Sequence, residues 1–195
     1  MSSSSPLDDW LAAVLAAPGL TAIRDPAQAR AMLLDDALRA ADLIRGITGP
    51  IVDVGSGGGS PGIPLAFELP DREVTLLEAE RRKCDFLRRW APPNATVVWG
   101  RAEEQEPDLY GVALAKALGQ PPVAVEWTLP LVRPGGAVVL WLGPTANLAA
   151  VATVAELLGG GPPEEHDGLV VLRKLAATPP GFPRRAGVAK KRPLA

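Results

Sequence analysis

The chain has 195 residues, of which 47% are apolar and 22% charged, and its formal net charge is −2 at pH 7. This length suits one well-buried domain and is short for two. With a single cysteine, Cys84, and a single histidine, His166, the sequence excludes an intrachain disulfide and lacks the usual ligands of a zinc site. We therefore expect one monomeric domain without a bound metal.

The sequence also predicts a cytoplasmic protein. Asp8 and Asp9 stand near the N-terminus where a secretory signal has lysine or arginine, and the apolar stretch there is short. Charged residues, prolines or glycines interrupt every later apolar run before about 18 residues, so no membrane span is expected.

Local signals place helices and strands in alternation along the chain. Ser5 and Pro6 start a helix over 6–17, and Asp25 and Pro26 start a longer helix that Gly46 ends. Strands are expected at 51–54, 74–77, 95–99, 112–115, 137–142 and 169–172, helices at 63–69, 81–90, 122–132 and 147–158, and a turn at 133–136. The polar stretch 159–168 is too short for a full strand.

This alternation predicts an α/β fold, a three-layer sandwich around a mostly parallel sheet. We divide the single domain into an N-terminal helical segment (1–46), a core (47–178) and a basic C-terminal tail (179–195). In such sheets the ligand lies across the carboxyl ends of the strands.

Basic residues gather in two stretches, 81–89 and 184–192. The first holds Arg81, Arg82, Lys83, Arg88 and Arg89 with one acid, Asp85, and the second holds Arg184, Arg185, Lys190, Lys191 and Arg192 with none. Two interpretations remain open: an edge that binds a polyanion, or a solvated helix face followed by a basic tail.

A glycine loop follows the first predicted strand, in the segment IVDVGSGGGSPGIPLA (51–66). Gly57, Gly59 and Gly62 satisfy G-x-G-x-x-G, and Glu78 lies 21 residues beyond Gly57, as in a dinucleotide-binding fingerprint. A nicotinamide-dependent oxidoreductase is therefore one alternative, and a tight turn of small residues is another.

The same loop resembles that of class I S-adenosylmethionine (SAM) methyltransferases, because Asp53, Gly55, Gly57 and Gly59 fit D-x-G-x-G-x-G. NAD brings a pyrophosphate that suits a helix N-terminus, whereas SAM brings an ammonium and a sulfonium that favour a carboxylate. We expect Asp53 to supply that carboxylate. Glu78, at the end of the second strand, is expected to accept hydrogen bonds from ribose hydroxyls with either ligand.

The resemblance extends to one family. From about residue 20 onward the chain is similar to the RsmG (GidB) family of bacterial enzymes, which methylate N7 of a guanine in 16S rRNA of the small ribosomal subunit. The matching segments are GLTAIRDPAQA (19–29), LLDDAL (33–38), DVGSGGGSPGIPLA (53–66), VTLLEAERRKCDFL (74–87), GRAEE (100–104), EWTLPLVRPGG (126–136) and GFPRRAGVAKKRPL (181–194). The resemblance implies a Rossmann-like class I fold, SAM as cofactor, and 16S rRNA or the small ribosomal subunit as partner.

The resemblance also implies roles for single residues. Gly55 and Ser60 would contact SAM, Glu78 its ribose, and Ala102 and Glu103 its adenine. The expected cofactor residues are Asp53, Gly55, Gly57, Gly59, Ser60, Glu78, Ala102, Glu103 and Lys116, and the expected RNA contacts are Arg184, Arg185, Lys190, Lys191 and Arg192. Lys116, where the family has arginine, is the candidate for positioning the acceptor, and no other catalytic residue is assigned.

Four further positions depart from the family pattern: Met32, Ser60, Gly111 and Leu142 replace a histidine, a bulky apolar residue, an aspartate and a lysine. They leave open whether turnover survives, so a SAM-binding protein with another substrate, or one without activity, stays an alternative.

Guanine N7 carries a lone pair and needs no general base, so the expected chemistry is alignment of the base with the SAM methyl group. Trp90, Trp99 and Trp141 are expected to pack in the core, because they occupy packing positions of the predicted elements. The tail, whose proline and glycine resist regular helix, is expected to lie over the RNA backbone.

Overall fold

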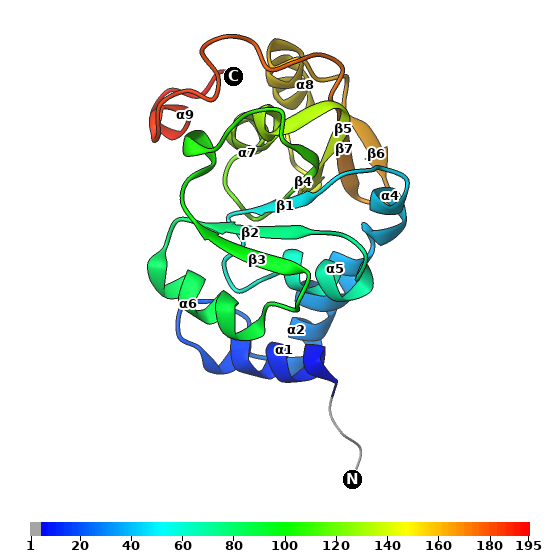
Figure 1. Ribbon diagram of the computed structural model, residues 1–195, viewed down its shortest axis with the longest axis vertical. Helices are drawn as coiled ribbons and strands as arrows, with labels where there is room; N and C mark the ends of the chain where they lie inside the picture. Colours follow the sequence, from blue (N-terminus) through cyan, green and yellow to red (C-terminus); the bar gives the residue numbers. More distant parts are fainter. Residues whose placement is uncertain (1–4) are drawn as a thin grey trace.

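The computed structural model describes residues 5–195, which form a seven-stranded sheet between two layers of helices (Figure 1). The strand order is β3-β2-β1-β4-β5-β7-β6, with parallel pairing from β3 through β5 and antiparallel pairing of β7 with β5 and with β6. The strands are β1 (Ile51–Val54), β2 (Val74–Glu78), β3 (Ala95–Trp99), β4 (Tyr110–Lys116), β5 (Val132–Trp141), β6 (Glu164–His166) and β7 (Leu169–Arg173). The predicted α/β fold class is confirmed.

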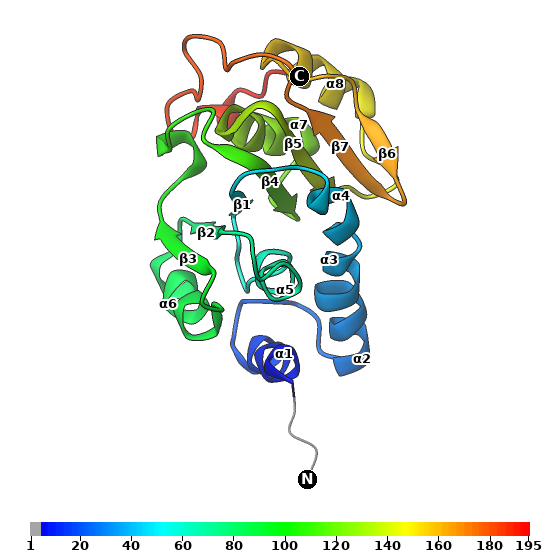
Figure 2. The same cartoon turned by 45° about the vertical axis from the view of Figure 1, so that its right-hand side comes forward.

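Each face of the sheet is covered by its own group of helices (Figure 2). One face carries α1 (Pro6–Ala16), α2 (Pro26–Ala29), α3 (Asp36–Leu38), α4 (Ala41–Arg45), α5 (Gly62–Glu68) and α6 (Arg81–Trp90). The other carries α7 (Pro121–Thr128), α8 (Leu148–Leu157) and α9 (Val188–Lys191). Apolar side chains of β1 alternate between the two cores, since Ile51 packs on the first side and Val52 on the second.

Elements with a strong local pattern lie where the sequence predicts them. β1, α6 and β3 have the expected bounds, and Cys84 and Leu87 point into the core from α6 as the helical spacing requires. The Ser5 hydroxyl accepts a hydrogen bond from the Asp8 N–H and forms the capping box that starts α1. Among residues 5–195, no helix combines the length and apolar character needed to span a membrane.

Four expectations about elements are wrong. The helix expected from 26 to 46 is divided into α2, a π-helical turn (Arg30–Asp35), α3 and α4. The expected turn 133–136 belongs to β5, because hydrogen bonds to Lys174 on the neighbouring chain segment continue the ladder through Gly135 and Gly136. The helix expected over 122–132 ends at Thr128, and a 3-10 turn (Leu129–Leu131) leads from it into β5. The stretch 159–168 holds only the three-residue strand β6, paired with β7, which agrees with the expectation that it is too short for a full strand. The tail contains the short helix α9, with Ala189 buried.

The tryptophans differ from one another in how deeply they are buried. Trp90 and Trp141 are partly buried against the core, as expected, but Trp99 is 59% exposed. Trp10, in α1, is fully buried, and its indole N–H donates to the Gly58 carbonyl oxygen at 2.9 Å. The N-terminal helix is therefore tied directly to the glycine loop.

Candidate functional site

Three adjoining cavities lie at the carboxyl ends of the parallel strands. The first, about 280 Å³, lies between the ends of β1 and β2 and residues 100–103; the second, about 370 Å³, lies between the glycine loop and the N-terminal helices; the third, about 610 Å³, lies beyond the ends of β4 and β5. Gly55, Glu78 and Ala117 line both the first and second cavities, and Lys116 and Ala117 line both the second and third. The three therefore form one continuous site around the end of β4.

Close packing explains the bare backbone of the loop. Gly55 has φ +72°, and a Cβ atom there would lie 2.3 Å from Leu118 Cδ1. A Cβ at Gly62 would lie 2.6 Å from Asp53 Oδ2 and 2.4 Å from Leu76 Cδ2. Side chains at these positions would fill the cavity wall or push α5 away from β1.

The expected anionic partner of the ligand, Asp53, lies beneath the loop. It is 1% exposed, its Oδ2 accepts a hydrogen bond from the Gly62 N–H at 3.1 Å, and it lines none of the three cavities. Burial raises the pKa of this carboxyl to about 7. Asp53 thus holds the start of α5 against β1, which is a different position from the expected one beside a cationic group.

Glu78 lies at the junction of the first two cavities. Its Oε2 accepts a hydrogen bond from the Gly57 N–H at 2.9 Å, and its Oε1 accepts one from the Glu80 N–H at 2.8 Å. Each carboxylate oxygen has a second lone pair, so the group keeps acceptor capacity for a ligand hydroxyl. The two backbone bonds fix the orientation of this carboxylate.

The wall of the first cavity joins segments that are far apart in the sequence. Ala102 and Glu103 line it, and Glu103 Oε1 accepts a hydrogen bond from the Gly187 N–H at 3.0 Å. Trp127 lines it as well, and its buried indole N–H has no hydrogen-bond partner among residues 5–195. The C-terminal tail is thereby part of the support of this cavity.

The second cavity is closed by the π-helical turn, and three side chains from the glycine loop and from the ends of β4 and β5 hold this turn and the following residue, Asp36, in place. The Ser60 hydroxyl donates to the Leu33 carbonyl oxygen at 2.7 Å, and the Trp141 indole N–H donates to the Asp36 carbonyl oxygen at 3.0 Å. Lys116 Nζ lies 2.5 Å from Asp36 Oδ2 and also donates to the Met32 carbonyl oxygen. We call these three donors, Ser60, Lys116 and Trp141, the clamp.

Three positions that depart from the family pattern meet at this contact, namely Met32, Ser60 and Lys116. Gly111 has a separate explanation: a Cβ atom there would lie 2.0 Å from the Thr48 carbonyl oxygen. Leu142 lines the third cavity. Sequence reasoning named these residues one by one but had no signal for the contact, because residues 32 and 116 are brought together only by the fold.

The expected RNA contacts of the tail fall into two groups. Arg184 differs from the prediction: its Nε and Nη2 lie 2.5 Å from the two carboxylate oxygens of Glu126, which is 3% exposed. Arg185, Lys190, Lys191 and Arg192 are exposed and form no ion pair among the described residues. The first side chain anchors the tail, and the other four are available to a ligand.

The sheet order and the cavities at its carboxyl edge define the fold of a class I SAM-dependent methyltransferase. The apo form of the SAM-dependent methyltransferase SibL has a TM-score of 0.63 at 15% identity, with 85% of this chain and 62% of that one covered. The precorrin-6y C5,15-methyltransferase of Geobacter metallireducens has a TM-score of 0.53 at 17% identity, with 81% of this chain and 92% of that one covered. These similarities show the fold.

The particular family follows from the sequence itself. Residues 8–157 match the GidB family, described as rRNA small subunit methyltransferase G. Ribosomal RNA small subunit methyltransferase G of Chloroflexus aggregans is 37% identical over 198 residues, covering 90% of this chain and 82% of the relative. The protein of that name in Nostoc punctiforme is 35% identical over 201 residues with the same coverage. The chain belongs to the GidB family.

Proposed function

We propose that this protein is a SAM-dependent methyltransferase that modifies N7 of a guanine in 16S rRNA of the small ribosomal subunit, as a monomer in the cytoplasm. The observation that carries the proposal is the continuous site from Glu78 to Lys116, at the carboxyl edge of the sheet, in a member of the GidB family. The relatives' name supplies the rRNA substrate and the class of reaction.

The residues of the first two cavities fit SAM. Glu78 has acceptor capacity for the ribose hydroxyls, and the Gly57 N–H orients it. Gly55 has no side chain, so the cavity stays open at a point where a Cβ atom would meet Leu118. Ala102 and Trp127 border the space for the adenine. When bound, SAM supplies an electrophilic methyl group.

The third cavity fits the acceptor base. It shares Lys116 and Ala117 with the cofactor cavity, and Trp141 and Arg39 add an aromatic ring and a second cation to its wall. Planar bases extruded from RNA are commonly held by aromatic or arginine side chains. Lys116 is the positioning residue, because its ammonium, 5.9 Å from the Trp141 ring centroid, is fixed between the two cavities.

No residue has to remove a proton in this reaction, since guanine N7 is an unprotonated acceptor. The contribution of the chain is to bind the base, orient N7 toward the methyl group and exclude water. Alignment of this kind supplies about 7–11 kcal/mol in well-oriented systems. His166, the one histidine of the sequence, lines none of the three cavities, which is consistent with a mechanism without a general base.

The cofactor is tested by calorimetry with SAM and with NAD. We expect SAM to bind and NAD not to bind, and we expect Glu78→Gln to weaken SAM binding about tenfold by removing the ionised acceptor. Glu80→Gln is the matched control, because Glu80 is exposed and lies two residues away. Equal affinity for SAM in the Glu78→Gln variant would remove Glu78 from the site.

The substrate is tested by mapping N7-methylguanine in 16S rRNA from cells with and without the gene. Loss of one modified guanine, restored by the wild-type gene, is the expected result. Binding of SAM with unchanged 16S rRNA modification would instead support a SAM-binding protein with another substrate or without activity.

A further inference from the structure

We propose that Trp99 and its neighbouring cations form a docking surface for a single-stranded segment of the RNA substrate, with a base stacked on the indole. We call this surface the Trp99 platform; its members are Trp99, Arg81 and Arg101. The proposal rests on the proposed function, because it takes RNA as the substrate, and it adds where that RNA lies outside the methyl-transfer site.

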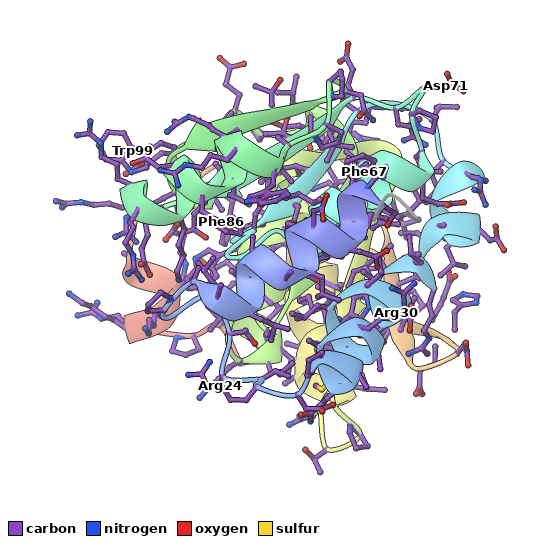
Figure 3. The ribbon with its side chains drawn as sticks, turned by 90° about the horizontal axis from the view of Figure 1, so that it is seen from below. Arg24, Arg30, Phe67, Asp71, Phe86 and Trp99 are labelled. Carbon is purple, nitrogen blue, oxygen red and sulfur yellow. The ribbon has the colours of Figure 1, made fainter. Side chains whose placement is uncertain are left out.

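Trp99 is unusual because a large aromatic ring is exposed and yet fixed. It is 59% exposed at the end of β3, at the margin of the molecule in Figure 3. Its indole N–H donates to the Ala79 carbonyl oxygen at 3.0 Å, and the Arg81 guanidinium carbon lies 5.7 Å from the ring centroid. A ring held in place loses little freedom when a base stacks on it.

The charges around the platform favour a polyanion. The nearby acids already have partners: Glu80 pairs with Lys83 at 2.9 Å, and Glu103 and Glu104 accept backbone N–H groups at 3.0 and 3.3 Å. Arg81 and Arg101 form no ion pair among residues 5–195. Lys83 offsets the charge of Glu80, and backbone N–H groups hold Glu103 and Glu104 in place. Arg81 and Arg101 are exposed and are therefore available to phosphate groups.

The platform adjoins the cofactor cavity and the C-terminal tail. Ala79 and Arg101 line the first cavity, and the bond between Glu103 and Gly187 brings the exposed cations of the tail to the same wall. α6 and α9 lie on the same side of the molecule in Figures 1 and 3. The two basic stretches of the sequence thus flank one end of the methyl-transfer site.

The combination of features selects RNA over an acidic protein as the partner. Phosphates account for the unpaired cations, and unpaired bases account for an exposed, immobilised indole that a carboxylate-rich peptide does not need. Single-stranded RNA offers both at once. Poly-glutamate is therefore the competing ligand in the test.

The test compares Trp99→Ala, Trp99→Phe and wild type for binding of unmodified 16S rRNA. We expect Trp99→Ala to weaken binding at least about fivefold through loss of base stacking, and Trp99→Phe to stay within about twofold. Trp99→Phe also removes the hydrogen bond to Ala79, so it separates stacking from a change in the cavity wall. Leu175→Ala is the control for loss of an exposed apolar side chain, because Leu175 is 67% exposed.

Salt titration tests the cations. Arg81→Ala combined with Arg101→Ala is expected to reduce the slope of log K against log salt by about 1.4, the value for two phosphate contacts on a single strand. Arg88→Ala, on the same helix but paired with Asp85 at 2.8 Å, is expected to leave the slope unchanged. SAM affinity is expected to stay within about twofold in the Trp99, Leu175 and Arg88 variants and in Arg81→Ala alone, because none of these residues lines the three cavities.

Two results would overturn the proposal. One is wild-type rRNA affinity in Trp99→Ala while the wild-type protein methylates 16S rRNA, which leaves the proposed function intact and removes the platform. The other is binding of poly-glutamate that depends on Trp99 as strongly as RNA binding does. If wild type neither binds nor methylates 16S rRNA, the proposed function itself fails.

Acrylamide quenching of tryptophan fluorescence is a second measurement. RNA is expected to reduce the quenching in wild type and to reduce it much less in Trp99→Phe.

Discussion

A buried carboxyl group, that of Asp53, controls how the glycine loop joins the sheet. Its pKa is about 7, because burial and, to a smaller extent, the charge of Glu78 raise it more than the bonds from Ser56 and Gly62 and the charge of Lys116 lower it. Between pH 3.8 and about 7 the folded state therefore holds a proton that the unfolded state has released. The stability contribution of the protonated group is complete below this range and is lost as the pH rises through it.

Asp53→Asn is expected to remove this pH dependence. The amide oxygen still accepts the Gly62 N–H, and an amide does not ionise. From pH 4 to pH 7.5, wild type should lose roughly 2–4 kcal/mol of unfolding free energy relative to the variant, because each pKa unit corresponds to about 1.4 kcal/mol. Urea unfolding at a series of pH values measures the difference. A constant difference across this range would contradict the raised pKa.

The two acids of the site show how far single residues can be predicted. Glu78 ends β2 and lies at the cavity junction, where the spacing from the glycine loop places it. The sequence equally predicts the location of Asp53 as the third residue of β1, but it does not predict the direction of its side chain. That direction depends on the alternation of β1 between the two faces and on the close approach of Gly62. Sequence spacing identifies the acid, while packing decides whether it reaches the ligand.

At the scale of elements, the π-helical turn is the feature that closes the cofactor cavity. A π turn shifts backbone hydrogen bonds to i→i+5 pairs and widens the helix, so its carbonyl oxygens become accessible to side-chain donors. Ser60, in the loop after β1, and Lys116, at the end of β4, donate to carbonyl oxygens of the turn. Trp141, at the end of β5, donates to the carbonyl oxygen of Asp36, the residue that follows the turn. The N-terminal helical segment is in this way attached to the strand ends that carry the site.

Removing two donors of the clamp is expected to loosen the turn. In Ser60→Ala combined with Lys116→Met, amide hydrogen exchange across residues 30–38 should accelerate about tenfold or more, since each lost hydrogen bond is worth roughly 1 kcal/mol. Thr153→Ala is the matched control, because the Thr153 hydroxyl donates to the Ala149 carbonyl oxygen within α8. Exchange rates in 30–38 that equal those of wild type would show that the clamp does not hold the turn.

Some elements of this fold can be predicted from the local sequence, and others depend on contacts with distant segments. α6 and β3 are specified by spacing and composition within ten residues, and both have the bounds that the sequence predicts. The π turn and the extension of β5 through Gly135 depend on partners far away, Lys116 and Lys174. The sequence pattern of one segment does not show which hydrogen-bond donors the fold will bring to it from another segment.

At the scale of the molecule, the C-terminal tail is an anchored part of the structure and not a loose basic extension. Arg184 forms two bonds with the buried carboxylate of Glu126 in α7, and Gly187 bonds to Glu103 at the first cavity. Phe182 and Leu194 pack against the core of that side. The basic composition of the tail concealed this difference between one anchoring arginine and its exposed neighbours.

Arg184→Ala and Arg185→Ala are therefore expected to differ in their effect on stability. Loss of Arg184 leaves the Glu126 carboxylate buried without its partner and should lower the unfolding free energy by about 2–4 kcal/mol, less than for a fully buried pair because the Arg184 side chain is 22% exposed. Arg185 is exposed, so its loss should change stability by less than about 0.5 kcal/mol.

The same pair of variants separates binding of the cofactor from binding of RNA. Arg184→Ala should weaken SAM binding several-fold, because the tail supports the cavity wall through Glu103, whereas Arg185→Ala should weaken only rRNA binding and reduce its salt dependence. Urea unfolding, calorimetry with SAM and rRNA binding at several salt concentrations measure the three quantities. The double variant Arg184→Met with Glu126→Met should recover most of the stability, since it removes the buried charge together with its partner. Equal effects of Arg184→Ala and Arg185→Ala on stability and SAM affinity would show that the tail is not anchored through this ion pair.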